Sequence, residues 1–549
     1  MRAANHLNSI VPHKSLIAVP FAGATTDPKP LGREIELKFL VNDDAFKTIR
    51  QATLLGYDAG RGAACRLHST YFDTERGDLR RHRIVLRMRR QDSRHVLTLK
   101  WEGRAGSSTF ERGELEAPAP SSLPDPALLG AAVEAEIMRV TEGRPLQPVF
   151  ATDIKRVVHR VAVGVSKIEA AFDTGFIVCG VQKTPVREIE LELKAGEPTD
   201  LYQLGLSLAA NFPVRLGIIT KAERGVLLSC GAHATAVRAA APKLAERTVD
   251  EAIDAVMSAC VAQFTANWPA FEGPDKVESV HQMRVAMRRF RAALTLFNRR
   301  FPCVEFRALR AEAKQIASAM GDARNWDVFE SLVNAGPRSA FPSESGFDAL
   351  MADATQRREG GHAAVAKLLA QPETTRFVLS AEAFVARRGW RNTLPGAELS
   401  RLVEPASGFA AECLERLHRR VCKRGKALLD LPPERRHDVR IALKNLRYAA
   451  DFFADLFSQA AVVKSYVQAA ARLQDALGGF NDMVMAADLV SQLDTASAGP
   501  ARAAGIIIGW HGRGAQGDDH SLRDCWRGFR KAKPFWTQAL TDPVAGAAM

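Results

Sequence analysis

The spacing of hydrophobic and polar residues changes once along the chain. Up to about residue 230, apolar and charged residues alternate in short segments, whereas from about residue 248 the apolar residues recur at helical spacing. Residues 34–39 read Glu-Ile-Glu-Leu-Lys-Phe, so a strand there points Glu34, Glu36 and Lys38 to one face and apolar side chains to the other. This pattern predicts an α+β protein whose first part is built of strands and whose second part is helical.

Several later segments repeat the alternation of charged and apolar residues, at 85–89, 95–100, 112–116, 155–160 and 187–194. A single strand with one charged face is simply solvated when its sheet packs on one side only. Here many strands carry a charged face, and the opposite face is regularly apolar. A closed or nearly closed antiparallel barrel fits this pattern best, because closure gathers the charged faces around one interior.

The charges in these strands indicate a ligand. The acidic positions are Glu34, Glu36, Glu188, Glu190 and Glu192, and the basic positions are Arg87, Arg89, Lys100 and Arg156. Carboxylates crowded into one interior repel one another unless hard cations lie between them, and such oxygen donors suit Mg²⁺ or Mn²⁺. Arginine and lysine bind phosphate oxygens. Together the two sets predict a binding site for metal and a chain of phosphates.

Six motifs of the first part resemble a known family. They are 34–38 (Glu-Ile-Glu-Leu-Lys), 71–74 (Tyr-Phe-Asp-Thr), 79–89 from Leu-Arg-Arg-His to Leu-Arg-Met-Arg, 98–100 (Thr-Leu-Lys), 188–192 (Glu-Ile-Glu-Leu-Glu) and 221–225 (Lys-Ala-Glu-Arg-Gly). In this order they resemble the CYTH domains, or triphosphate tunnel metalloenzymes. The resemblance is strongest to bacterial inorganic triphosphatases in which a CYTH domain is fused to a CHAD domain.

The resemblance implies an eight-stranded antiparallel β tunnel that holds divalent metal and a linear triphosphate. Position by position, it implies metal binding by Glu34, Glu36 and two of Glu188, Glu190 and Glu192, with Asp173 as a further acidic residue near the metal. It implies phosphate binding in catalysis by Lys38, Arg87, Arg89, Lys100, Arg156 and Lys221. Phosphoryl transfer depends mainly on positioning and charge neutralisation, so no covalent phosphoenzyme is expected.

The second part contains an internal repeat. Residues His281, Arg284, Arg288 and Arg291 recur in spacing and in charge type as His437, Arg440, Lys444 and Arg447. Offsets of three, seven and ten residues keep the four side chains within an arc of about 80° on a helix. Two helices therefore each present a face of four cations, which is costly unless a polyanion binds there.

These repeats resemble the CHAD domain, a helical module of two pseudo-symmetric halves. The resemblance implies that the eight repeated residues line a groove for inorganic polyphosphate. Arg324-Asn325 departs from the family, which usually has arginine followed by aspartate, so a salt bridge expected there is in doubt. We predict a disordered extension at 1–30, the CYTH domain at 31–231, a linker at 232–247 and the CHAD domain at 248–540.

Composition agrees with polyanionic partners. The net charge is +13 and the sequence pI is about 9.5, which suits polyphosphate and nucleic acid alike, but only 7% of residues are aromatic and no strand carries an aromatic cluster for base stacking. Nucleic acid is therefore the weaker option. Eight cysteines without a CxxC pair suggest a reduced, cytoplasmic compartment, and no apolar run approaches the ~18 residues of a membrane span.

The sequence thus predicts a metal-dependent hydrolase of phosphoanhydride bonds that converts tripolyphosphate to pyrophosphate and phosphate. The helical domain would bind long-chain polyphosphate, and it would either deliver chains to the tunnel or localise the enzyme to polyphosphate, including granules. Two alternatives use the same tunnel, namely a class IV-type adenylate cyclase and a thiamine triphosphatase. A third alternative is a non-catalytic polyphosphate-binding or granule-associated protein.

Overall fold

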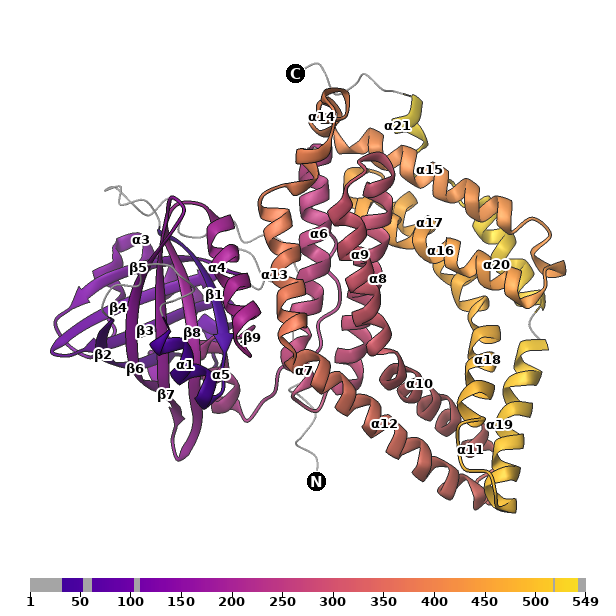
Figure 1. Cartoon of the computed structure of the whole chain (residues 1–549), viewed down its shortest axis with the longest axis horizontal. Helices are drawn as coiled ribbons and strands as arrows, with labels where there is room; N and C mark the ends of the chain where they lie inside the picture. Colours follow the sequence, from indigo (N-terminus) through magenta and orange to yellow (C-terminus); the bar gives the residue numbers. More distant parts are fainter. Residues whose placement is uncertain (1–31, 53–61, 103–108, 517–518, 542–549) are drawn as a thin grey trace.

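A barrel of antiparallel strands is followed by an extended array of helices in the computed structural model (Figure 1). The structure describes residues 32–52, 62–102, 109–516 and 519–541, so the predicted extension at 1–30 lies outside the described residues. The predicted fold class, an antiparallel sheet domain followed by a helical region, is confirmed. Residues 232–247 contain no helix or strand and connect the two parts.

Eight long strands close the barrel. The strands are β1 (Gly32–Leu40), β2 (Ala63–Asp73), β3 (Ile84–Gln91), β4 (Arg94–Glu102), β5 (Thr109–Ala119), β6 (Gln147–Val163), β7 (Ser166–Cys179), β8 (Gln182–Ala195) and the two-residue β9 (Arg215–Leu216). Their order is β5-β4-β3-β2-β6-β7-β8-β1, and β1 also pairs with β5, which completes the circle. Strand β9 adds to β1 outside this circle and was not predicted from the sequence.

Strand register brings charged residues face to face inside the barrel. Lys38 lies opposite Glu190 and Asp173 lies opposite Arg156, which are pairs of opposite charge, whereas Asp173 also lies opposite Glu188, a second carboxylate. The alternate residues of the same strands, such as Leu37 and Phe39 of β1, are fully buried outside the barrel wall. The period-two pattern therefore places charge inside and apolar side chains outside.

Five helices belong to the barrel domain, namely α1 (Asp43–Gln51), α2 (Asp78–Arg81), α3 (Ala131–Thr141), α4 (Pro198–Asn211) and α5 (Lys221–Cys230). Helices α1 and α4 cover the outward apolar face of β1, β7 and β8. Helix α3 packs Val133, Ile137 and Val140 against the apolar face of β3 and β4. These contacts explain why the outer face of a barrel can be apolar.

The helical part consists of α6 (Val249–Ala266), α7 (Trp268–Phe271), α8 (Lys276–Arg300), α9 (Val304–Ala319), α10 (Gly321–Ala335), α11 (Pro337–Ala340), α12 (Gly346–Ala370), α13 (Pro372–Ala386), α14 (Gly396–Leu402), α15 (Ala406–Arg424), α16 (Pro433–Phe453), α17 (Ala460–Ala476), α18 (Gly478–Val490), α19 (Ala498–Gln516), α20 (Asp519–Lys531) and α21 (Thr537–Thr541). The helical spacing of apolar residues on α8 is confirmed, because the side chains at its four positions are fully buried, namely Val280, Met283, Met287 and Phe290.

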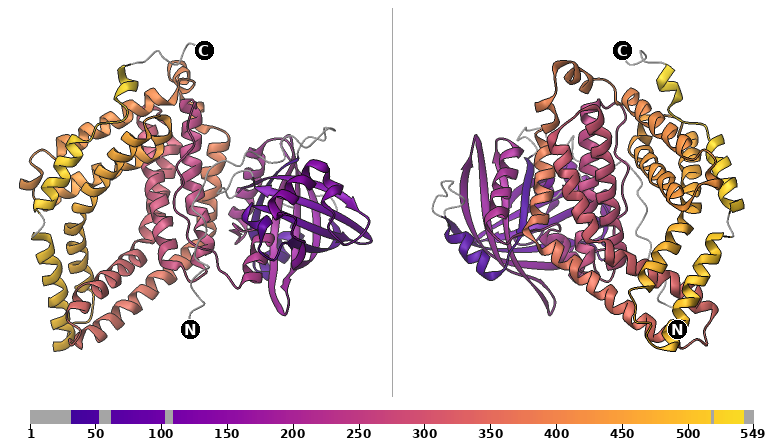
Figure 2. Two further views of the ribbon diagram at one scale, coloured as in Figure 1. Left: turned by 180° about the vertical axis from the view of Figure 1, so that it is seen from behind. Right: turned by 45° about the vertical axis from the view of Figure 1, so that its right-hand side comes forward.

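The barrel and the helices share one apolar core. Helix α4 packs against both β1 and α13. Figure 2 shows the barrel domain beside the helical part in two further views. Gly205 makes this possible, because a Cβ there would lie 3.0 Å from Leu37 Cδ1 and 3.6 Å from Leu379 Cδ1 of α13. Leu37, Phe39, Phe377 and Leu379 belong to one continuous cluster of buried apolar residues.

The connection at 232–247 is fixed to the helical part by hydrogen bonds. Backbone N–H groups of this segment donate to Asp275 and to Asn267, in both cases at 2.8 Å, and to Asp455 at 2.7 Å. An ion pair of 2.5 Å between Arg215 and Glu272 also joins the two parts. The barrel is therefore held in a defined position on the helical part rather than tethered by a free linker.

Candidate active site

A cavity of about 210 Å³ lies inside the barrel. Charged residues line it from β1, β3, β4, β5, β6, β7, β8 and α5. Among the predicted barrel site residues whose side chains the structure describes, all line the cavity except Glu188. The side chain of Glu34 lies outside the described residues, and Glu188 lies fully buried in the adjoining wall. The residues that line it are Glu36, Lys38, Arg87, Arg89, Lys100, Arg156, Asp173, Glu190, Glu192 and Lys221.

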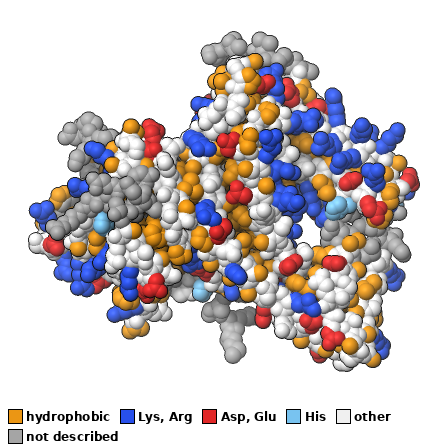
Figure 3. Space-filling view, viewed as in Figure 1, with side chains coloured by type: hydrophobic (Ala, Val, Ile, Leu, Met, Phe, Trp, Pro, Cys, Tyr) orange, Lys and Arg blue, Asp and Glu red, His pale blue; other side chains and the backbone are white. Residues whose placement is uncertain are grey.

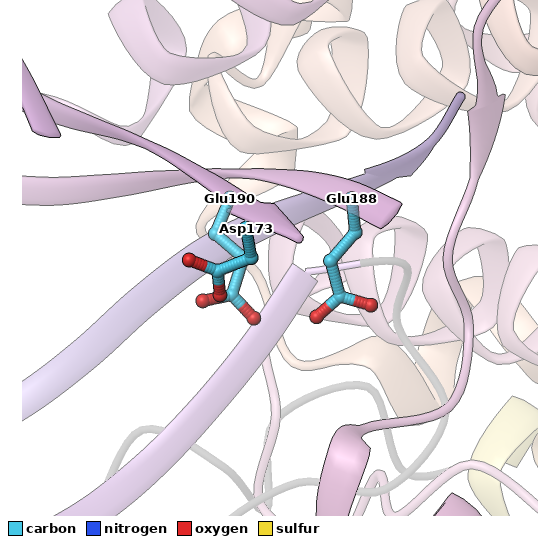
Figure 4. A group of neighbouring side chains, drawn as sticks. All are labelled: Asp173, Glu188 and Glu190. Atoms are coloured by element: carbon cyan, nitrogen blue, oxygen red, sulfur yellow. The ribbon is translucent and has the colours of Figure 1, made fainter. Parts of the chain in front are cut away.

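Three carboxylates form a buried cluster in this wall. Asp173 of β7 and Glu188 and Glu190 of β8 each offer an oxygen within 4.8 Å of the others (Figure 4). Figure 4 shows all three side chains projecting from neighbouring strands in the same direction, with Asp173 close beside Glu190. The sequence had left open which two of Glu188, Glu190 and Glu192 act together. The cluster contains the first two, whereas Glu192 forms a 2.5 Å ion pair with Lys194.

Two lysines are inserted among these carboxylates. Lys221 Nζ lies 2.7 Å from Asp173 Oδ2 and 2.9 Å from Glu190 Oε1, and it also contacts Glu188 Oε1. Lys38 Nζ lies 3.0 Å from Glu190 Oε1 and 3.9 Å from Glu188 Oε1. Both lysines therefore contact the same two oxygens, Glu188 Oε1 and Glu190 Oε1.

Arg156 joins the same network from β6. Its Nε and Nη2 donate to the two carboxylate oxygens of Asp173 at 2.7 and 2.6 Å, which is the bidentate geometry, and Nη2 also donates to Glu190 at 2.6 Å. Arg224 of α5 reaches Glu188 Oε2 at 3.4 Å. The acidic cluster is thus contacted by cations from β1, β6 and α5.

The network keeps the carboxylates ionised. Burial would raise the pKa of Glu190, but Lys221, Lys38 and Arg156 outweigh it and hold the pKa well below its usual range. Burial also opposes ionisation of Asp173, and Lys221 and Arg156 again lower its pKa. Conversely, burial would lower the pKa of Lys221, yet the carboxylates raise it well above its ordinary value. At neutral pH Asp173, Glu190 and Lys221 are therefore charged.

The other side of the cavity is basic. Arg87 of β3 lies 3.4 Å from the hydroxyl of Thr98 and 3.8 Å from Glu114 Oε1, and Lys100 lies 3.1 Å from the same Glu114 oxygen. Arg89 is different, since it forms no ion pair with any residue that the structure describes. Its burial, reinforced by repulsion from Arg87 and Arg156, lowers its pKa to about 10.

A buried guanidinium without a carboxylate is costly in a folded protein unless an anion binds to it. The Nε atom of Arg89 is also buried without a hydrogen-bond partner in the described part of the chain. Perturbed groups of this kind in a cavity are typical of functional sites. Arg89 therefore marks the wall where an anionic ligand is most needed.

Helix α5 fixes the position of Lys221. Thr220 and Glu223 form a reciprocal capping box, with the Glu223 N–H donating to Thr220 Oγ1 at 3.1 Å and the Thr220 N–H donating to Glu223 at 2.7 Å. Gly225 lets α5 lie directly on Phe150, because a Cβ there would be 2.1 Å from that ring. Each position of the 221–225 motif thus has a structural or electrostatic task.

Sequence reasoning missed several residues of the cavity. Tyr71 is buried, stacks on Phe150 with ring centroids 4.4 Å apart, and hydrogen-bonds to Arg87. Burial would raise its pKa, but Arg87 and Arg89 outweigh it and lower the pKa. Glu114 and Glu116 also line the cavity. Their place on the charged face of 112–116 could have identified both glutamates, since they alternate like Glu34 and Glu36.

The helical part brings the predicted repeat together in space. Arg284 of α8 donates to the carbonyl of Ala317 at 2.6 Å, and its Nη1 lies 3.4 Å from where a Cβ of Gly321 would be, at the start of α10. Arg440 of α16 is placed similarly. Its Nη2 lies 3.8 Å from where a Cβ of Gly478, the first residue of α18, would be. The three-helix units α8 to α10 and α16 to α18 are therefore structurally equivalent.

Both basic faces contain buried arginine atoms without partners. The Nε atoms of Arg291 and Arg447, which occupy equivalent positions, have no hydrogen-bond partner in the described residues. Burial and the neighbouring Arg310 and Arg288 lower the pKa of Arg291. Figure 3 shows lysine and arginine side chains gathered over this part of the helical array, beside an opening in the surface.

The two histidines that begin the repeats are not equivalent in environment. His281 is half-buried, and burial together with Arg324 lowers its pKa, whereas His437 is exposed. Burial lowers the pKa of Arg324, and the carboxylate of Asp327 opposes that shift. Asp327 also accepts a hydrogen bond of 2.9 Å from His362.

Comparison with known proteins identifies both domains. The model of the CYTH domain matches residues 32–226, and the model of the CHAD domain matches residues 255–491. The chain is therefore a CYTH–CHAD protein, as the motifs had indicated. Among the described helices, none combines the length and the apolarity of a membrane span.

Individual relatives match parts of the chain. It is 35% identical over 163 residues to an inorganic triphosphatase of Haemophilus influenzae, a match that covers 30% of this chain and 46%, or less than half, of that protein. The crystal structure of a CHAD domain from the plant Ricinus communis is 28% identical and covers 55% of this chain and 96% of its own, with a TM-score of 0.45. A candidate adenylyl cyclase from Hippeastrum, described as having a dominant triphosphatase activity, is 19% identical and covers 36% and 96%, with a TM-score of 0.28.

Proposed function

We propose that this protein hydrolyses inorganic tripolyphosphate to pyrophosphate and phosphate inside the barrel. The observation that carries the proposal is the cavity in which a buried carboxylate cluster faces a buried basic wall, where Arg89 lacks a carboxylate partner among the described residues. Water attacks the terminal phosphorus, the bond from that phosphorus to its bridging oxygen breaks, and pyrophosphate leaves. The similarity to an inorganic triphosphatase over 163 residues supports this reading.

The acidic cluster has the donors that a divalent cation of the Mg²⁺ or Mn²⁺ type requires. Asp173, Glu188 and Glu190 offer only carboxylate oxygens, and these lie within 4.8 Å of one another. These three residues, with Glu36 beside Lys38, would hold the cation. When bound, such a cation neutralises phosphate oxygens and lowers the pKa of a water molecule.

The protein's own cations would hold the substrate. Arg87 and Arg89 of β3 and Arg156 of β6 project into one cavity from either side of β2, and planar guanidinium groups bind phosphate oxygens bidentately. Lys100 adds a point charge on the next strand, β4. Because these side chains are buried or half-buried and already line the cavity, little reorganisation is needed when the phosphate chain binds.

Inorganic tripolyphosphate suits the cavity better than a nucleotide does. Charged side chains enter the cavity from eight different elements, so neither end offers a broad apolar surface for a base. Tyr71 is its only aromatic lining residue in the described part, and that ring is already stacked on Phe150. Adenylate cyclase and thiamine triphosphatase activities are therefore the alternatives that the assay must exclude.

We further propose that the helical domain binds long-chain polyphosphate along the basic faces of α8 and α16. The equivalent, unpartnered Nε atoms of Arg291 and Arg447 support this, since buried donors of this kind await an anionic acceptor. All eight repeated residues, from His281 to Arg291 and from His437 to Arg447, belong to these two faces.

The packing favours localisation over delivery. Phe290, on the opposite side of α8 from the basic face, packs against Phe377 of α13 with ring centroids 6.1 Å apart, and α13 in turn packs on α4 of the barrel. A layer of helices thus separates the basic face from the barrel (Figure 1). A chain bound on α8 would therefore keep the enzyme near polyphosphate without entering the tunnel directly.

The test is phosphate release by the full-length protein with Mg²⁺ or Mn²⁺ from tripolyphosphate, ATP, thiamine triphosphate and long-chain polyphosphate. A Glu188→Gln, Glu190→Gln variant should lose the activity, and Glu134→Gln, an exposed residue of α3, is the matched control that should retain it. Preference for tripolyphosphate supports the proposal. Cyclic AMP formation from ATP, preference for thiamine triphosphate, or no release at all would each replace it with the corresponding alternative.

A further inference from the structure

Lys221 occupies the place that a divalent cation would need. Its ammonium contacts all three carboxylates of the acidic cluster, Asp173, Glu188 and Glu190. We propose that Lys221 is an exchangeable counter-ion, which neutralises the cluster in the absence of metal and moves to the phosphate chain when a divalent cation takes its place. This inference rests on the proposed function, because it concerns the same metal and phosphate site.

The charge balance among the described residues favours such an exchange. Among their ion pairs, four carboxylates are met by four cations, and the members are Glu36, Asp173, Glu188 and Glu190 against Lys38, Arg156, Lys221 and Arg224. The charges within this set balance. A divalent cation added without any other change would leave two uncompensated positive charges in a buried site, which is strongly unfavourable. Movement of one resident cation from the carboxylates to the phosphate chain halves this excess.

Lys38 and Arg156 are held too firmly to be that cation. Lys38 is only 2% exposed, and it is enclosed by Gly217, where even a Cβ would lie 2.7 Å from Lys38 Cγ. The Gly217 N–H also donates to the Lys38 carbonyl at 2.8 Å, which fixes the backbone on both sides. Arg156 is bound to Asp173 by two parallel hydrogen bonds. Neither side chain has room to withdraw.

Lys221 has both the freedom and a destination. It is the first residue of α5, its side chain is 12% exposed and lines the cavity, and the capping box holds the backbone while the four side-chain bonds remain rotatable. Its ammonium is close enough to Tyr71 to affect the pKa of that phenol, and Tyr71 hydrogen-bonds to Arg87. A rotated Lys221 therefore joins the basic wall that contains Arg87 and Arg89.

Metal and phosphate binding are consequently coupled. The released ammonium is stabilised only when a phosphate chain is present, so each ligand strengthens the binding of the other. In the absence of phosphate, Lys221 competes with the metal for the same oxygens. Removing its charge should then have opposite effects on the two ligands, which no simple structural role predicts.

The experiment measures Mn²⁺ binding to metal-free, full-length protein by electron paramagnetic resonance, alone and with a non-hydrolysable bis-methylene triphosphonate. In Lys221→Met and Lys221→Gln, Mn²⁺ alone should bind about tenfold more tightly or better, and the triphosphonate about tenfold more weakly, because a charge-assisted contact is lost. Lys221→Arg should show no tightening, since a guanidinium still competes. Lys155→Met, an exposed residue on the outer face of β6, should match the wild type in both measurements.

Unchanged or weaker Mn²⁺ binding in both Lys221→Met and Lys221→Gln would overturn the inference, and so would undiminished coupling between the two ligands. Failure of the proposed function is distinguishable. If wild-type protein binds Mn²⁺ and a Glu188→Gln, Glu190→Gln variant does not, the metal site exists whether or not any phosphate is released. Whether Mn²⁺ binds more tightly or more weakly to the Lys221 variants than to the wild type then decides the inference by itself.

Discussion

Gly225 allows helix α5, with Lys221 at its first position, to lie against the barrel, and Gly225→Ala should test this directly. A Cβ at Gly225 would lie 2.1, 2.3 and 2.5 Å from Cε2, Cδ2 and Cζ of the Phe150 ring. Carbon atoms in contact normally stay about 3.5 Å apart or more, so helix or ring must move by about 1 Å. Phe150 cannot give way easily, because it is buried and stacked on Tyr71.

The magnitude follows from two opposing effects. Overpacking in a well-filled interior costs about 1–3 kcal/mol, whereas replacing glycine by alanine within a helix favours folding by about 0.5–1 kcal/mol. The net loss should be about 1–2 kcal/mol in the free energy of unfolding, which lowers the Tm of a domain of this size by about 2–8 °C. Displacement of Lys221 by about 1 Å should also reduce kcat/KM for tripolyphosphate by up to about 100-fold.

Differential scanning calorimetry of metal-free protein measures the change in Tm, and phosphate release from tripolyphosphate measures the change in kcat/KM. Gly360→Ala provides the matched control, because Gly360 lies within helix α12 and a Cβ there meets nothing within 4 Å. That variant should be stabilised by about 0.4–1 kcal/mol and keep full activity. The reasoning is refuted if Gly225→Ala is as stable and as active as Gly360→Ala, since the contact with Phe150 would then impose no constraint.

Three further predictions concern the helical face, acid stability and metal. Arg291→Gln with Arg447→Gln should weaken long-chain polyphosphate binding about tenfold or more and reduce its salt dependence, as measured by fluorescence anisotropy. Tripolyphosphate turnover should stay unchanged, and the exposed control Arg401→Gln should bind polyphosphate like the wild type. The pKa values of Asp173 and Glu190 are lowered in the folded protein, so their contribution to stability is complete above their ordinary pKa values of about 4 and is lost as the pH falls through the lowered values. The Tm should therefore drop on acidification below about pH 4, and a Tm that is flat from pH 5 to pH 2 contradicts this. Mn²⁺ at 100 times its Kd should stabilise the barrel by about 2.7 kcal/mol, and this gain should disappear in Asp173→Asn if the acidic cluster is the metal site.

Much of the fold could be predicted from periodicity alone. A period of two with charge on one face indicated a closed barrel, and the helical period from residue 248 indicated the second part, because these patterns record which face of each element is buried. The residues from His281 to Arg291 recur from His437 to Arg447, and the structure shows the corresponding equivalence. Arg284 lies against the start of α10, and Arg440 lies against the start of α18. The two-residue strand β9 and the shared core through α4 and α13 left no such signal.

The site was only partly predictable for a related reason. Residue type and face indicated which side chains enter the tunnel, but alternation treats Glu188, Glu190 and Glu192 alike. Strand register decided that the first two meet Asp173, whereas Glu192 pairs with Lys194. The carboxylates Glu114 and Glu116 followed the same alternation and were overlooked because no motif included them.

The sequence by itself determined the two domains, the charged interior and the doubled basic face, since all three depend on local spacing along single strands and helices. Only the tertiary structure decided how the charges are matched. Closure of β1 onto β5 and the placement of α5 by Gly225 bring Lys221 among three carboxylates and leave Arg89 without one in the described chain. Electrostatic pairing depends on distances of a few ångströms between residues far apart in sequence, and no periodicity contains those distances.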